Sequence, residues 1–144
     1  MPANPEVNVL LVEDDPGDIV MTQEAFEHHK IGNPLHVVND GAQALEFLRR
    51  TGPYTGAPRP GLIMLDLNLP KVDGREVLVE IKNDADLRTI PVVVLTTSQA
   101  QEDILRSYQS HANAYVAKPV DFLKYIDVIG QIDAFFATVA ELPR

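Results

Sequence analysis

The chain has 144 residues, of which 45% are hydrophobic and 23% are charged, and it contains no cysteine. These values indicate an ordinary folded domain, and they exclude disulfide bonds and zinc–thiolate sites. The net charge of −9 disfavours contact with nucleic acid or anionic membranes. The chain starts without the basic and apolar regions of a signal peptide and has no membrane-spanning apolar run, so we expect a cytoplasmic protein.

Five short runs rich in Val, Ile and Leu predict five β-strands. They lie at residues 7–12, 35–38, 62–65, 90–95 and 114–117. Segments with the apolar spacing of a helix follow each run, and the last of these continues over residues 122–139. Asp15-Pro16, Asp40-Gly41, Asp73-Gly74 and Asp121 are helix-start signals.

This alternation predicts an α/β, flavodoxin-like (βα)5 fold, doubly wound around a five-stranded parallel sheet. Strands that are apolar throughout are typical of a sheet covered by helices on both faces. Ligand sites in such sheets form beyond the carboxyl ends of the strands. The residues that directly follow the strands are therefore the ones to examine for chemistry.

Carboxylates crowd the ends of the first and third predicted strands. Glu13, Asp14 and Asp15 follow the first strand, and Asp66 follows the third within "GLIMLDLNLP". Helix capping accounts for Asp15, but two carboxylates about 4 Å apart repel by roughly 4 kcal/mol at an effective dielectric constant near 20. If strands one and three are neighbours, Glu13, Asp14 and Asp66 form a cluster that calls for a hard divalent cation, and Mg²⁺ suits oxygen ligands.

The fourth predicted strand ends at Thr96, and the fifth leads into Lys118-Pro119. A hydroxyl donor, an ammonium group and a bound cation around Asp66 would neutralise and hold a phosphoryl group on that carboxylate. Aspartate is an established nucleophile for phosphoryl transfer.

This ordered set resembles the receiver domain of two-component response regulators. The motifs that carry the resemblance are the acids of "LLVEDDPGD", the Asp of "DLNLPKVDGREVL", the Thr of "IPVVVLTTS" and the Lys-Pro of "NAYVAKPVD". The resemblance covers about residues 7–140 and implies a single receiver domain over residues 1–144 with no output domain. More narrowly, the motifs are similar to those of small stand-alone regulators that partner phytochrome-type sensor histidine kinases.

The resemblance implies that Asp66 accepts a phosphoryl group from a kinase phosphohistidine in a Mg²⁺-dependent reaction. Glu13 and Asp14 would hold Mg²⁺ together with Asp66, directly or through water, and the backbone carbonyl of Asn68 would supply a further ligand. Glu13 stands where many receivers have Asp, which makes direct coordination by Glu13 less secure.

The resemblance further implies that Lys118 pairs with Asp66 or its phosphate, and that Thr96 binds a phosphoryl oxygen. Tyr115 would move inward as Thr96 moves, and the surface of the fourth helix, fifth strand and fifth helix would repack. The family also leads us to expect a cis peptide at Pro119.

The expected function is signalling by changed protein–protein contacts, with slow self-dephosphorylation rather than catalysis on external substrates. A homodimer through the fourth helix, fifth strand and fifth helix, or through the C-terminal helix around Phe135 and Phe136, is a further expectation. Alternatives are a phosphorylation-independent scaffold and an aspartate-nucleophile phosphatase, which would want a second Asp where this chain has Asn68. A flavin mononucleotide site is disfavoured because the acids after the first strand would repel phosphate.

Overall fold

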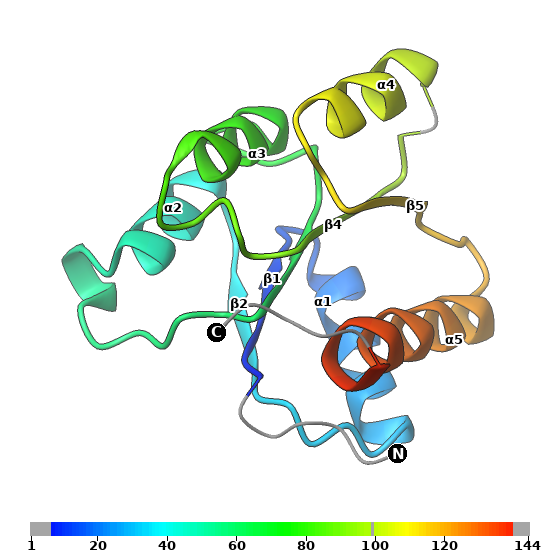
Figure 1. Ribbon diagram of the computed structural model, residues 1–144. Coiled ribbons are helices and arrows are strands. Elements are labelled where there is room, and N and C mark those ends of the chain that lie inside the picture. Colours follow the sequence, from blue (N-terminus) through cyan, green and yellow to red (C-terminus); the bar gives the residue numbers. More distant parts are fainter. Residues whose placement is uncertain (1–6, 99, 140–144) are drawn as a thin grey trace.

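The computed structural model describes residues 7–98 and 100–139. A five-stranded sheet forms its centre (Figure 1). The strands are β1 (Val9–Val12), β2 (Leu35–Val38), β3 (Leu62–Leu65), β4 (Val92–Thr96) and β5 (Ala114–Ala117). They lie in the order β2-β1-β3-β4-β5, and every pair is parallel. The predicted fold class is confirmed, and β1 and β3 are neighbours.

The predicted strand bounds are right for β2, β3 and β5 but shift for the other two strands. β4 begins at Val92 rather than at Ile90. Pro91 has no N–H to give to a ladder, and the N–H of Val92 donates instead to the side chain of Asn113 at 2.8 Å. Pairing at that edge of the sheet therefore starts one residue after the proline.

Five helices follow the strands. They are α1 (Pro16–His28), α2 (Gly41–Arg49), α3 (Gly74–Asn83), α4 (Gln101–Gln109) and α5 (Phe122–Asp133), and a short 3-10 helix spans Gly52–Tyr54. Each of the four predicted aspartates caps its helix by accepting a backbone N–H two or three residues further along the chain, as for Asp40 from Gln43 at 2.7 Å. Short polar side chains therefore fix where four of the five helices begin.

The predicted helix over residues 122–139 is wrong in its second part. The α-helix ends at Asp133, and Ala134–Val139 continue as a π-helix. Phe136 packs against the core, whereas Phe135 is 55% exposed. The wider π-turn changes which residues share a face, so a stripe drawn with α-helical spacing does not hold here.

Both faces of the sheet are buried. Figure 1 shows α1 and α5 on one side of the sheet and α2 and α3 on the other. Alternate residues of β1 divide between the two cores: Val9 and Leu11 face α1 and α5, and Leu10 and Val12 face α2 and α3. This arrangement explains why β1 and β3, in the middle of the sheet, are apolar at every position. None of the described helices is long and apolar enough to cross a membrane.

Candidate functional site

The backbone ladder of the sheet continues past the strand ends into the predicted site. The N–H of Glu13 donates to β2 at 3.0 Å, and the N–H of Asp66 donates to β1 at 3.1 Å. The N–H of Lys118 donates to the carbonyl of Thr96 at 2.8 Å. The backbones of these residues are thus hydrogen-bonded in the same way as those of strand residues. The residues meet at the carboxyl ends of the strands, as predicted.

Strand alternation assigns the charged groups and the predicted switch residues to opposite faces of the sheet. Side chains two residues before Glu13, Asp66 and Lys118 lie in the α1/α5 core, so these three groups point toward α1. Thr96 continues the opposite face, and Tyr115 packs against the α2/α3 core. Thr96 nevertheless reaches the Asp66 carboxylate and helps to lower its pKa, so the two sets meet beyond the strand ends.

The Lys118 ammonium lies among three carboxylates. It donates to Glu13, to Asp18 at 2.7 Å and to Asp66 at 2.9 Å. An ammonium group has three N–H bonds, so all of them are used. Burial lowers the pKa of Lys118, but the three carboxylates outweigh it and hold that pKa above its usual range.

Asp18 is the member of this cluster that sequence reasoning missed. It lies in the first turn of α1, where an acidic residue is ordinary because the helix dipole favours it. That position was its only signal, and nothing in the sequence indicated that it would reach a lysine 100 residues away.

Asp66 is buried, yet it is held as a carboxylate. Its Oδ1 accepts the N–H of Asn68 at 3.2 Å and its Oδ2 accepts from Lys118. Burial acts to raise the pKa of Asp66, but Lys118, with help from Thr96 and the Asn68 N–H, lowers it below the usual value. The side chain is therefore ionised and available as a nucleophile at neutral pH.

The oxygens of Glu13, Asp14 and Asp66 lie within 4.8 Å of one another, which brings the predicted metal ligands together. Glu13 is buried and accepts the N–H groups of Asp14 and Asp15 at 3.1 and 3.2 Å. Burial raises the pKa of Glu13 to about 7, although Lys118 acts against it. Asp14 is exposed, so its carboxylate is the most open of the three.

The predicted switch residues are connected through Ser98. Thr96 is fully buried, and its hydroxyl accepts the N–H of Ser98 at 3.4 Å. The Tyr115 hydroxyl donates to the carbonyl of Ser98 at 2.7 Å, and the Ser98 hydroxyl donates to Asp103 of α4 at 2.6 Å. A chain of polar contacts therefore runs from the site to Tyr115 and α4.

The expected cis peptide at Pro119 is wrong, because the described residues contain no cis peptide bond. The trans form is favoured by roughly 0.5–1 kcal/mol for a peptide that precedes proline.

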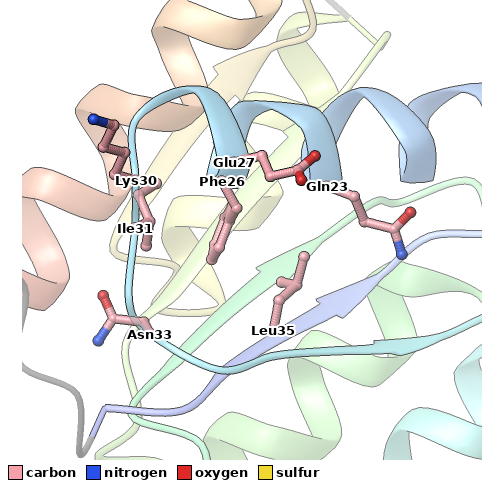
Figure 2. Close-up of a pocket in the computed structure, with 7 residues that line it drawn as sticks. All are labelled: Gln23, Phe26, Glu27, Lys30, Ile31, Asn33 and Leu35. Carbon is pink, nitrogen blue, oxygen red and sulfur yellow. The ribbon is translucent and has the colours of Figure 1, made fainter.

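A surface pocket lies away from these residues, between the end of α1 and the start of β2 (Figure 2). Its lining consists of Gln23, Phe26, Glu27, Lys30, Ile31, Asn33 and Leu35. Leu35 pairs with Val9, and each is the first residue of its strand. The pocket therefore lies at the amino ends of the strands, whereas the acids follow the carboxyl ends. None of the predicted site residues lines it.

Comparison with known proteins places these observations in a family. Residues 9–129 match the family described as the response regulator receiver domain. The chain is 44% identical over 141 residues to the response regulator Rcp1 of Synechocystis sp., and the alignment covers 98% of this chain and 96% of that protein.

Two solved structures are similar over 96% of this chain and 99% of their own. The Mn²⁺-bound form of response regulator Rcp1 has a TM-score of 0.91 at 43% identity. The phosphorylated cyanobacterial phytochrome response regulator RcpA has a TM-score of 0.92 at 44% identity.

Proposed function

This chain belongs to the response regulator receiver family, and we propose that it takes a phosphoryl group onto Asp66 from the phosphohistidine of a sensor histidine kinase. The observation that carries this proposal is the contact of the buried, ionised Asp66 with Lys118 at 2.9 Å. A buried carboxylate that an ammonium group keeps ionised and holds in place by a hydrogen bond has the charge and the position that a phosphoryl acceptor needs.

In the proposed reaction, a carboxylate oxygen of Asp66 attacks phosphorus in line with the bond to the donor imidazole. The P–O bond to Asp66 forms as the P–N bond breaks, and the electron pair leaves with the imidazole nitrogen. Lys118 neutralises charge on the phosphoryl oxygens, and the hydroxyl of Thr96 donates to one of them. Asp66 and Lys118 are in contact before the donor arrives, so the acceptor carboxylate is already oriented.

The oxygen donors of Glu13, Asp14 and Asp66 fit a divalent cation, and we propose that they hold Mg²⁺ with the carbonyl of Asn68. When bound, the ion would supply positive charge for the transferring phosphoryl group. Glu13 already accepts from Lys118 and two backbone N–H groups, which favours Asp14 and Asp66 as the direct ligands.

We propose that the signal leaves the site through Thr96, Ser98 and Tyr115. A phosphoryl oxygen that recruits the Thr96 hydroxyl would disturb its contact with the Ser98 N–H, and Ser98 also holds the Tyr115 hydroxyl. Movement of Tyr115 would then change the surface of α4, β5 and α5 that other proteins meet.

The kinase is proposed to be of the phytochrome type because RcpA is a phytochrome response regulator. Slow self-dephosphorylation would reset the protein.

The test is the intact mass after incubation with acetyl phosphate, with and without Mg²⁺. The expected result is the gain of one hydroxylamine-labile phosphoryl group that requires Mg²⁺ and is absent in Asp66→Asn, which is nearly isosteric. Asp127→Asn is the matched control, because Asp127 lies exposed on α5 and bonds Gln131. Labelling that persists in Asp66→Asn would show that Asp66 is not the acceptor, and no labelling of the wild type by acetyl phosphate or by a phosphorylated kinase would favour the scaffold alternative.

A homodimer is a separate proposal. Leu105 and Tyr108 on α4 are 59% and 50% exposed, and Phe135 is 55% exposed beyond α5. Light scattering during gel filtration of Leu105→Glu and Phe135→Ser would identify which surface pairs, and a monomeric wild type at all concentrations would contradict the dimer.

A further inference from the structure

The unexpected member of the site is Asp18. Its Oδ2 lies 2.7 Å from the Lys118 ammonium, and this contact joins α1 to the residue that follows β5. Among the three carboxylates around Lys118, the Asp18 side chain is the most exposed, at 16% against 2% for Glu13 and 8% for Asp66. It is therefore the partner that water can most easily replace.

The geometry points to a competition for one ammonium group. Lys118 has three N–H bonds, and Glu13, Asp18 and Asp66 use all of them. A phosphoryl group on Asp66 would present several more acceptor oxygens to Lys118. Lys118 can turn toward those oxygens only if one present bond is given up, and the bond to the partly exposed Asp18 is the least costly to lose.

Asp18 also connects the site to the packing between α1 and α5. Its backbone carbonyl accepts the hydroxyl of Thr22 at 2.8 Å, and the hydroxyls of Thr22 and Tyr125 lie 3.2 Å apart. Tyr125 belongs to α5 and is 1% exposed. The first turn of α1, which carries Asp18, is thus tied both to Lys118 and to a buried tyrosine of α5.

We infer that Asp18 is a positioning residue that holds Lys118 in the resting protein and slows phosphoryl uptake by competing with the incoming phosphoryl oxygens for the Lys118 ammonium. This inference rests on the proposed function of Asp66. The carboxylate of Asp18 has no direct part in the phosphoryl transfer and acts through Lys118.

The kinetic test compares the rate of phosphoryl uptake from acetyl phosphate, at saturating Mg²⁺, in the wild type and three variants. Asp18→Asn should raise the rate roughly two- to fivefold, the range expected for the loss of one partly screened ion pair. Asp18→Glu restores the charge and should return the rate toward that of the wild type. Glu24→Gln, which removes one exposed negative charge from the same helix, should leave the rate unchanged.

A second measurement needs no phosphorylation. The free energy of unfolding in urea, without Mg²⁺, is measured for four proteins: the wild type, Asp18→Asn, Asp66→Asn and the double variant. With Asp66 ionised, Lys118 keeps two carboxylates after Asp18 is lost, but in Asp66→Asn it keeps only Glu13. The loss of Asp18 should therefore destabilise Asp66→Asn more than it destabilises the wild type.

The two measurements separate the possible failures. Additive effects on unfolding would overturn the competition whatever the kinetics are, and so would an uptake rate in Asp18→Asn equal to or below that of the wild type. A wild type that takes up no phosphoryl group from either acetyl phosphate or a phosphorylated kinase would overturn the proposed function, and with it the role of Asp18 in uptake. Coupling in unfolding together with faster uptake in Asp18→Asn supports the inference.

Discussion

The guanidinium of Arg75 and the carboxylate of Asp103 form two hydrogen bonds side by side, 2.8 Å from Nε to Oδ1 and 2.7 Å from Nη2 to Oδ2. They join the start of α3 to the first turn of α4. Within α4 only Ser107 is buried, so apolar packing holds this helix weakly. The same Asp103 accepts the hydroxyl of Ser98. Polar contacts therefore decide where α4 lies relative to the proposed switch residues.

We expect Asp103→Asn to lower the free energy of unfolding at pH 7 by roughly 1–2 kcal/mol, because a bidentate charged pair is lost. Hydrogen bonds from Arg75 and Ser98 hold the pKa of Asp103 below its usual value. A lowered pKa stabilises the fold above the unfolded pKa, near 4, and this contribution is lost as the pH falls further. Urea unfolding should thus show the difference from wild type shrinking below about pH 4. Glu102→Gln is the neighbouring control, and a difference that did not shrink between pH 5 and pH 2 would contradict the charge-pair account.

Asp133 predicts the opposite pH dependence. It is 2% exposed, its Oδ1 has no hydrogen-bond partner among the described residues, and burial raises its pKa to about 6. A raised carboxyl pKa means that stability is fully present below the unfolded pKa, near 4, and is lost as the pH rises through 6. Asp133→Asn should therefore be more stable than the wild type at pH 8, by roughly 2 kcal/mol, and should lose this advantage by pH 4. Urea unfolding at pH 8 and pH 4 measures this difference in the free energy of unfolding, with Asp127→Asn as the exposed control. A difference of the same size at both pH values would refute the raised pKa of Asp133.

Gly74 packs closely against the backbone of Asp66, the proposed acceptor. A Cβ on Gly74 would lie 2.1 Å from the backbone oxygen of Asp66 and 2.6 Å from Cα of Leu67. Gly74→Ala must therefore move the Asp66 backbone, and we expect a loss of roughly 3 kcal/mol in unfolding free energy together with slower phosphoryl uptake. In Gly130→Ala the nearest atoms to the new Cβ belong to the ring of His29, which can turn away at the loss of its hydrogen bond to the Ile126 carbonyl, so the effect should stay within about 1 kcal/mol. Equal effects of the two changes would argue against the backbone contact at Asp66.

The Mg²⁺ site predicts a specific role for Asp14. Asp14→Asn should weaken Mg²⁺ binding by roughly tenfold or more while leaving the fold intact, because the side chain is exposed and Glu13 and Asp66 keep their contacts with Lys118. The chain has no tryptophan to report binding, so isothermal titration calorimetry is the suitable measurement. An affinity equal to that of wild type would remove Asp14 from the ligand set.

The sequence by itself determined the five strands, the starts of four helices and which acidic and polar residues follow the strands. These features are local: a continuous apolar run predicts a strand buried on both faces, and Asp15, Asp40, Asp73 and Asp121 cap the next turn of their own chain. The sequence left open whether the first and third strands are neighbours. The structure pairs β1 with β3, and this pairing brings Asp66 beside Glu13 and Asp14.

Only the tertiary structure decided which charges meet. Asp18 reaches Lys118, and Asp103 reaches Arg75, across sequence separations for which no periodic pattern exists. Both acids lie in the first turn of a helix, where an acidic residue is expected for local reasons alone. The change from α-helix to π-helix after Asp133 also carries no signal in the apolar spacing. Such contacts depend on how whole elements pack together, because packing fixes the distance between side chains that local rules place independently.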